Sequence, residues 1–582
     1  MAPHDPTTTG TATTMAADNG IASSLRGPPS STAETQVAGH NTDRLSSKDG
    51  HDDDDDASIR ERTPSEAREE DHDGQYANDE DLGGMATRVT STVSIAETLP
   101  LYRELLFVTV ICMAQLFTQA GLGQAIPILH IIADTFGVTN TGDITWYIAG
   151  YSLTVGTFIL FAGRLGDTFG YKTMYLVGMS WFSVWSMVTG LAVYSNHVLF
   201  TFGRVLQGIG PALCLPNALA ILGATYNPGK RKSMVFAAFA ATAPTGSVLG
   251  SAFASLFALA WWPWAWWCFA IVLAATTVLG YFVIPPCPPS HMANVPPTWK
   301  GKLKFLDLPG AVVGITGLIL FNFAWNQAPI VGWGTPYVYV TLILGVLFVA
   351  AFFYIEMKWT ESPLLPFDAL TADVGFVLGA VACGWACFGI WFWYTWEFFE
   401  EIRGASPLLA SAWISPVTVS GLCAAVFTGL LIHKIGPAWV MTIALCAFMT
   451  GTVLMATAPV DQIYWSQTFV STIIQPWGMD MSFPAGTLIL SNAVSKRHQG
   501  IAASLVNTVV NYSIALGLGF AGTVEIHVNN GGKTKEDVLK GYRGAFYVAM
   551  GICGLGIAIC LSFVFKSHFM KRPDKSKDEE KA

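Results

Sequence analysis

Long apolar runs separated by short polar connections fill the chain from about residue 100 to residue 570. A helix needs about 20 mostly apolar residues to cross a bilayer, because its backbone groups must be satisfied internally in hydrocarbon. This criterion predicts an all-α, polytopic membrane protein with about fourteen transmembrane helices. Their approximate positions are 105–127, 144–163, 174–194, 198–223, 233–257, 264–284, 308–326, 337–356, 374–396, 409–432, 438–457, 464–491, 501–522 and 544–566.

The composition agrees with this pattern. The chain has 582 residues, of which 52% are hydrophobic and only 13% are charged, whereas a soluble chain carries about 25% charged residues. Residues 1–100 differ from the rest, because they are rich in Thr, Ser, Asp and Glu and almost free of aromatic residues. They lack the apolar surface that would offset chain entropy, and we expect a disordered acidic tail.

Basic residues mark the orientation. Lys and Arg gather in alternate connections, such as NPGKRK at Asn227 to Lys232 and the stretch after Lys571, while most of the opposite connections are nearly bare. Short basic loops favour the cytoplasm. We therefore expect both termini in the cytoplasm, and a multi-pass protein of the plasma membrane, with the vacuolar membrane as the alternative.

An internal duplication organises the helices. GLLIHKIG, Gly429 to Gly436, repeats the outer glycines of GRLGDTFG, Gly163 to Gly170, at the same separation, and similar elements follow each copy. The predicted units are the acidic tail 1–100, a six-helix half 101–284, a connecting loop with two inserted helices 285–372, a second six-helix half 373–566 and a cytoplasmic tail 567–582.

Four stretches of the sequence carry a family resemblance. GRLGDTFGYK resembles the loop signature of the major facilitator superfamily, and RVLQGIGPA, Arg204 to Ala212, resembles its fourth-helix motif. The helix count and WWPWAWWCF, Trp261 to Phe269, are similar to the fourteen-helix drug:proton antiporter branch. GMDMSFPAGTLILSN, Gly478 to Asn492, resembles the fungal aminotriazole-resistance-like group within it.

The resemblance implies roles for the loop residues. It makes Asp167 the acid that steadies one conformation, with Arg164 and Lys172 as local partners. The glycines, Gly163 and Gly170 among them, would let the second and eleventh helices approach closely, as small residues do in membranes. A merely solvated turn is the alternative interpretation.

Two charged residues fall within predicted membrane helices. A cation there is costly, so Arg204 must face a cavity or a partner. The resemblance implies that it tunes a proton or substrate site, and a structural helix-to-helix hydrogen bond is the alternative. Asp480 is the first candidate for proton coupling, against a structural hydrogen-bonded acid. Glu397 lies nearer a predicted outer end, where we expect an interfacial group beside an aromatic belt.

The sequence departs from the branch in two places. The first helix reads FTQAGLGQAIP, without the acid of the usual D-x-T-type motif, and the fifth reads AATAPTGSVLGSA, with Ala243 before Pro244 where Gly-Pro is usual. The second departure leaves the coupling direction open. The bend at Pro244 and close helix packing at Gly208, Gly246 and Gly250 are still expected.

These observations favour a secondary transporter whose halves rock around a midplane cavity. We expect proton-driven efflux of a small toxic or metabolic compound; an importer or facilitator of a small nutrient such as ammonium, and a transporter-like receptor, are the alternatives. Neutral amides suit a polar substrate. The expected cavity residues are Gln115, Gln119, Gln124, Asn217 and Asn511, with Asn322 and Trp325 if the insertion touches the cavity.

Other classes of function find no support in the sequence. No G-x-x-x-x-G-K-[ST] loop occurs, which argues against an ATP-driven pump. Cys383 and Cys387 share a helix face, yet no His or second Cys pair accompanies them. We expect no enzyme activity, cofactor, metal or nucleic-acid partner, but a monomer whose partners are a small-molecule substrate, protons and the lipid bilayer.

Overall fold

The computed structural model describes residues 99–226, 230–286, 297–360, 363–364, 371–493 and 499–569. In this part of the chain the regular secondary structure is helical, and thirteen helical segments are long and apolar enough to cross a membrane. The all-α polytopic fold is therefore confirmed. The remaining predicted segment, 464–491, is helix α17 (Gln467–Ala493), which is too polar to count among the thirteen. Almost all of the two predicted tails lies outside the described residues.

The first half contains the helices α2 (Leu101–Gly123), η2 (Ile126–Ile128), α3 (Leu129–Phe136), α4 (Thr141–Phe169), α5 (Tyr171–Leu191), α6 (His197–Gln207), α7 (Ile209–Thr225), α8 (Lys230–Ala258) and α9 (Pro263–Val283). The first three of these helices together form one membrane span. The span α6–α7 is interrupted at Gly208, where a Cβ atom would lie 2.5 Å from the carbonyl oxygen of Tyr151. Glycine there lets α4 approach closely.

A short helix and a hairpin follow. Helix α10 (Trp299–Phe305) precedes α11 (Leu308–Val331) and α12 (Pro336–Lys358), and α11 packs against α12, α4 and α18. The contact with α18 is polar: Asn326 Nδ2 donates to Asn322 Oδ1 at 2.8 Å and to the Ala515 carbonyl at 3.1 Å. The bond from Asn326 to the Ala515 carbonyl ties the inserted hairpin to the second half.

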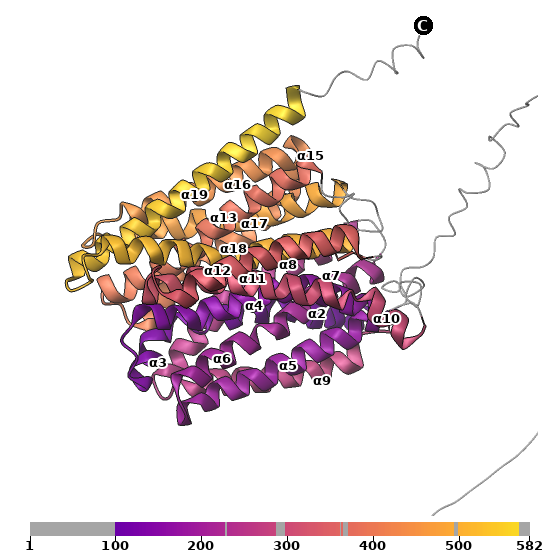
Figure 1. Ribbon diagram of the computed structural model, residues 1–582, viewed down its shortest axis with the longest axis horizontal. Helices are drawn as coiled ribbons and strands as arrows, with labels where there is room; N and C mark the ends of the chain where they lie inside the picture. Colours follow the sequence, from indigo (N-terminus) through magenta and orange to yellow (C-terminus); the bar gives the residue numbers. More distant parts are fainter. Residues whose placement is uncertain are drawn as a thin grey trace, which may run out of the picture. The chain divides into compact units, whose positions relative to one another are not determined.

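The second half repeats the pattern of the first. Its helices are α13 (Ala372–Glu397), a π-helical turn η6 (Phe398–Ile402), α14 (Pro407–Ile414), α15 (Pro416–Ile435), α16 (Pro437–Ala456), α17, α18 (Gln499–Val528) and α19 (Lys535–Phe569). In Figure 1 the first half, in indigo to magenta, lies beside the second half, in orange to yellow. The halves meet where α4 packs against α18 and where α8 packs against α14 and α15.

The duplicated glycines occupy matching positions. Gly170 ends α4 with φ 95° and Gly436 ends α15 with φ 82°. Side chains other than glycine rarely adopt this backbone region, so each copy uses glycine to turn sharply into the next helix. We call the end of the bundle that carries Gly170 and Gly436 the motif end, and the other the opposite end.

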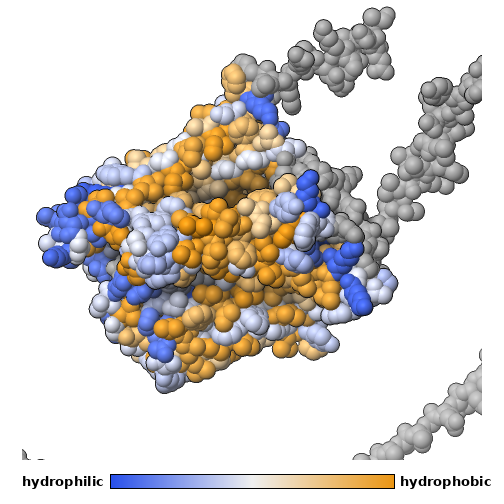
Figure 2. Space-filling view, in the orientation of Figure 1, coloured by the Kyte–Doolittle hydropathy of each residue, from blue (hydrophilic) through white to orange (hydrophobic). Residues whose placement is uncertain are grey.

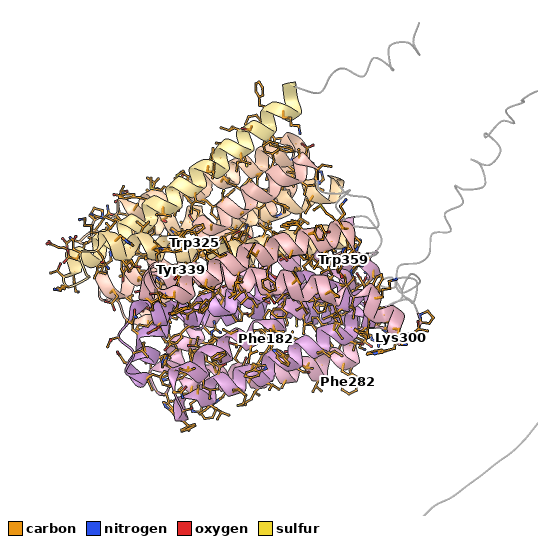
Figure 3. All side chains as sticks on the ribbon, viewed as in Figure 1. Phe182, Phe282, Lys300, Trp325, Tyr339 and Trp359 are labelled. Carbon is orange, nitrogen blue, oxygen red and sulfur yellow. The ribbon has the colours of Figure 1, made fainter. Side chains whose placement is uncertain are left out.

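The surface is divided as a bilayer requires. Figure 2 shows an apolar belt between two ends where hydrophilic residues gather. In Figure 3 Lys300 and Trp359 lie toward the motif end, and Trp325 and Tyr339 lie on the other side of the belt. Exposed Trp299, Trp359 and Trp465 fit the interfacial preference of tryptophan.

Candidate transport site

The signature connection is tied to other helices at the motif end. Asp167 Oδ1 accepts a hydrogen bond from the Tyr171 hydroxyl at 2.7 Å. Lys172 Nζ donates to the carbonyls of Tyr281 at 2.8 Å and Ile284 at 2.5 Å. Carbonyls at the end of a helix carry partial negative charge, so the ammonium group caps α9. The loop therefore joins α4, α5 and α9 within the first half.

Arg164 reaches out of the first half. Its Nη2 donates to the Pro363 carbonyl, and its guanidinium lies over the Phe305 ring at 4.9 Å. Phe305 belongs to α10 and Pro363 follows α12, so Arg164 contacts both ends of the inserted segment. Arg164 therefore links α4 of the first half to the inserted segment.

Glycines in α4 face two different partners. A Cβ atom on Gly163 would lie 3.1 Å from the Ser504 hydroxyl, and one on Gly156 would lie 2.7 Å from the Tyr512 backbone nitrogen. Both partners belong to α18, the thirteenth helix predicted from the sequence. The sequence analysis expected the eleventh, and that assignment is wrong: α16 occupies the eleventh place and packs against α17 and α19.

Arg204 lies inside the first half, fully buried. Its Nε donates to the Tyr147 carbonyl at 2.8 Å, its Nη1 donates to Gln207 Oε1 at 2.6 Å, and its guanidinium lies 4.6 Å from the Tyr151 ring. Gln207 in turn donates to the Ser186 hydroxyl at 2.7 Å. The network connects α4, α5 and α6, and it places the cation among helices of one half.

Asn217 and Asn511 are also held by helix contacts. Asn217 Nδ2 donates to the carbonyls of Leu213 at 2.7 Å and Ala162 at 3.3 Å, so it packs against α4. Asn511 Nδ2 donates to the Asn507 carbonyl at 3.0 Å, close to Gly156. The structure therefore places these two amides along the α4 contacts and not together around one cavity.

A small cavity lies between the halves near the middle of the bundle. It has a volume of about 20 Å³, which is enough for one water-sized guest. Its walls come from α2, α8, α13, α14, α15 and α17: Gln119, Leu122, Ala243, Pro244, Ser247, Val248, Phe388, Trp391, Phe392, Ile414, Val417 and Met479. Of the predicted cavity amides, only Gln119 lines it. Gln124 is buried directly after the end of α2, and its Nε2 has no hydrogen-bond partner among the described residues.

Asp480 lies beside this cavity at the contact between the halves. Its side chain is 8% exposed, and its Oδ2 accepts no hydrogen bond from any described residue. A Cβ atom on Gly421 would lie 2.7 Å from that oxygen and 2.8 Å from the Pro244 ring, so both approach the same point of α15. Pro244 and Met479, the neighbour of Asp480, both line the cavity. A buried carboxyl without a partner can bind a proton or a cation.

Small residues bring α2 and α8 into backbone contact next to the cavity. A Cβ atom on Gly246 would lie 2.2 Å from the Leu116 carbonyl oxygen, and one on Gly250 would lie 2.4 Å from that of Ala120. Side chains could not fit without separating the helices. The wall that carries Gln119 is therefore rigidly attached to α8.

A carboxylate anchors the motif end of the first half. Glu104 Oε2 pairs with Arg231 Nη2 at 2.5 Å, and its Oε1 accepts from the Tyr226 hydroxyl at 2.9 Å. Lys232 donates to the Gly223 carbonyl at 3.1 Å, and burial lowers the pKa of its ammonium group. These contacts fix the connection between α7 and α8 to the start of α2.

The sequence analysis missed a cluster at the opposite end. It took Glu397 for an interfacial group, and this prediction is wrong, because the side chain is only 4% exposed. Glu397 Oε2 lies 3.2 Å from His130 Nε2 and accepts from the Tyr542 hydroxyl at 3.2 Å. The acidic run WEFFEE was the available signal, but nothing in the sequence indicated that His130, 267 positions away, would meet it.

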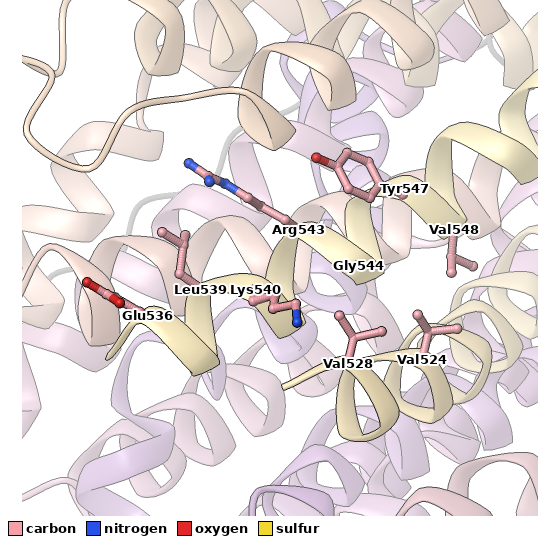
Figure 4. Close-up of a pocket in the computed structure, with 9 residues that line it drawn as sticks. All are labelled: Val524, Val528, Glu536, Leu539, Lys540, Arg543, Gly544, Tyr547 and Val548. Atoms are coloured by element: carbon pink, nitrogen blue, oxygen red, sulfur yellow. The ribbon is translucent and has the colours of Figure 1, made fainter. Parts of the chain in front are cut away.

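A larger groove lies away from the contact between the halves. A groove of about 760 Å³ separates the end of α18 from the start of α19, with Val524, Val528, Lys540, Arg543 and Tyr547 among its walls (Figure 4). Both helices belong to the second half. The groove therefore does not lie on a path between the halves.

Two packed six-helix bundles whose helices are long and apolar enough to cross a membrane are typical of a membrane transporter. The chain matches the Major Facilitator Superfamily over residues 111–390 and 376–582. It belongs to that superfamily, which confirms the family predicted from the sequence motifs.

Relatives with assigned names cover most of the chain. It is 53% identical to a low affinity ammonium transporter of Saccharomyces cerevisiae, over 85% of this chain and 95% of the relative. It is 46% identical to the efflux pump terJ of Aspergillus terreus, over 81% of this chain and 90% of the relative. It is 37% identical to the aminotriazole resistance protein of Saccharomyces cerevisiae, over 81% of this chain and 86% of the relative. These similarities place the chain with the fungal drug-efflux group.

A solved structure shows the same fold. The human organic anion transporter MFSD10 aligns with a TM-score of 0.54 at 14% identity, over 79% of this chain and all of that one. At this identity the likeness concerns the fold alone.

Proposed function

We propose that the protein is a proton-coupled exporter of a small toxic or metabolic compound, in which the halves alternate between openings at the two ends. The observation that carries this proposal is Asp480, a buried carboxyl without a hydrogen-bond partner among the described residues, placed against Pro244 of the other half. A proton taken up there and released on the other side would drive substrate in the opposite direction. Similarity to an efflux pump and to a resistance protein supports the direction.

The motif end faces the cytoplasm in this proposal. Arg164, Lys172, Arg231 and Lys434 all lie at that end, and cytoplasmic loops carry an excess of Lys and Arg. Plasma membrane is the expected location. The signature connection would then steady one of the two conformations from the cytoplasmic side.

A second candidate is uptake or facilitated passage of ammonium. The 53% identity to a low affinity ammonium transporter favours it. So does the cavity of about 20 Å³, which suits a water-sized cation and has aromatic walls at Phe388, Trp391 and Phe392 beside the Asp480 carboxyl. Aromatic faces and carboxylates both attract cations.

Proteoliposomes with an imposed pH difference separate the candidates. An exporter expels a preloaded azole or metabolite faster when the proton gradient runs inward, whereas an ammonium pathway accumulates labelled methylammonium and ignores the azole. A transporter-like receptor binds without net flux. A deletion strain that becomes sensitive to a panel of toxic compounds supports export, and one that becomes resistant contradicts it.

A further inference from the structure

His130 and Glu397 join the two halves at the opposite end of the bundle. His130 belongs to α3 of the first half, and Glu397 is the last residue of α13 in the second. Besides the contact of 3.2 Å with Glu397, His130 Nδ1 lies 3.6 Å from Glu401 Oε1. One imidazole is thus held between two carboxylates of the other half.

The backbone around Glu397 is shaped to present these carboxylates. Residues Phe398–Ile402 form a π-helical turn directly after Glu397. Such turns are uncommon in helices and occur frequently at functional sites. Here the turn follows the buried Glu397 directly, and it carries Glu401 beside the same imidazole.

Other titratable groups surround the pair on every side. The Tyr542 hydroxyl of α19 donates to Glu397, and the Tyr394 hydroxyl donates to Glu525 of α18 at 2.7 Å, with the two tyrosine rings 5.4 Å apart. Further charged or titratable groups at this end of the neighbouring elements are Asp134 of α3, Asp143 of α4, Glu400 of η6, Arg403 after η6, His527 of α18, and Lys535, Glu536, Asp537, Lys540 and Arg543 of α19. Arg403 is directed elsewhere, to Thr468 and the Pro459 carbonyl.

We propose that His130 and Glu397 form a latch that holds the halves together at the opposite end and that a proton on Glu397 releases it. The proposal rests on the alternating function proposed above. Between an imidazolium and a carboxylate the contact is a charge-assisted hydrogen bond, which is stronger than a neutral one. A protonated Glu397 loses the charge that attracts the imidazolium, so the opposite end opens when protons are abundant on that side.

The latch can be observed without measuring transport. Spin labels at Leu259→Cys and Leu408→Cys, both exposed, report the separation of the halves at this end. Cys423 and Cys446, which are exposed, and Cys287, which lies outside the described residues, are first replaced by serine. In the full chain in nanodiscs, we expect a single short separation near neutral pH and a growing long component on acidification, because a proton on Glu397 removes the charge that attracts the imidazolium.

Glu397→Gln removes the charge and keeps the shape. It should raise the ratio of long to short separations roughly tenfold near neutral pH and abolish the response to acid. Tyr542→Phe removes a hydrogen bond but leaves the ion pair, so it should keep the acid response. Glu536→Gln, an exposed acid at the same end outside the cluster, is the matched control and should behave as the parent.

An unchanged distribution and acid response in Glu397→Gln would overturn the latch. His130→Gln tests the same contact from the first half, so the proposal remains testable if Glu397→Gln does not fold. A normal latch in a protein that moves none of the compounds would refute the proposed function and leave the latch standing. If the protein transports the compounds but Glu397→Gln leaves the distance distribution unaltered, the latch is refuted and the proposed function stands.

Discussion

The hydroxyl oxygens of Ser255 and Ser411 lie 2.9 Å apart, and they belong to different halves of the protein. Both are buried at the opposite end, where α8 meets α14. If the halves separate there during transport, this contact must break in every cycle. It therefore offers a direct way to stop the movement.

Replacing both serines by cysteine should create a lock. Side chains this close suit the short span of a disulfide. We expect the oxidised Ser255→Cys/Ser411→Cys protein to lose transport completely and a reductant to restore it, with each single variant remaining active. Flux in proteoliposomes before and after reduction provides the measurement.

A matched pair within one half controls for the oxidation itself. Cys387 Sγ lies 3.3 Å from the Thr452 hydroxyl, and both residues belong to the second half. Thr452→Cys therefore offers the native Cys387 a partner without bridging the halves, and its oxidation should leave transport largely intact. Full activity of the oxidised Ser255→Cys/Ser411→Cys protein would show that the opposite end does not open.

Two glycines should respond to alanine in opposite directions. A Cβ atom on Gly250 would lie 2.4 Å from the Ala120 carbonyl oxygen, and backbone cannot move aside cheaply. We expect Gly250→Ala to destabilise the fold by about 1–3 kcal/mol through overpacking. Gly375 of α13 has no other atom within 4 Å of an added Cβ, so Gly375→Ala should stabilise by up to about 1 kcal/mol through helix propensity.

Thermal unfolding in one detergent compares the two variants. A lower midpoint for Gly250→Ala together with an unchanged or higher midpoint for Gly375→Ala is the expected result. Equal midpoints would mean that α2 and α8 separate without cost, contrary to the close packing seen between them.

Arg204→Lys should act on stability more than on coupling. Lysine cannot reproduce both the Nε bond to the Tyr147 carbonyl and the planar contact with the Tyr151 ring. Loss of one charged hydrogen bond costs about 1.5–3 kcal/mol. We expect a lower unfolding midpoint and, in the protein that folds, an unchanged dependence of flux on the pH difference. A shifted pH dependence would instead give Arg204 the tuning role implied by the family.

How far the sequence predicted the structure depended on how local each signal was. Helix spans, the repeat and the turns at Gly170 and Gly436 follow from patterns within about 20 residues, so hydropathy and glycine spacing revealed them. The same criterion of length and apolar character also predicted segment 464–491, although Gln475, Asp480 and two prolines make α17 more polar than the other spans.

The contacts between distant segments were beyond that reasoning. Asn217 is an intramembrane amide, as the cavity prediction required, but its partners on α4 make it a packing residue. Glu397 was taken for an interfacial group because it lies near a predicted outer end, beside Trp393 and Trp396. Only the fold shows that α3 delivers His130 to it. Helical periodicity states which face a residue occupies but not which helix covers that face.

Asp480→Asn provides the sharpest test of mechanism. The substitution keeps the shape of the side chain and much of its hydrogen-bonding capacity, but asparagine cannot bind and release a proton. Because Asp480 lies at the contact between the halves beside Gly421 and Pro244, we expect uphill, pH-driven export to vanish. Substrate binding and exchange between equal concentrations should survive, because the pathway remains.

Asp167→Asn distinguishes loss of coupling from loss of movement. Its carboxylate accepts from Tyr171 in the signature connection, far from the midplane cavity. An altered connection should shift the balance of the two conformations and slow every mode of transport, whatever the pH. Both variants are compared in proteoliposomes with and without an imposed pH difference. If Asp480→Asn still concentrates substrate against its gradient, the proton binds elsewhere, and Glu397 becomes the next carboxyl to replace.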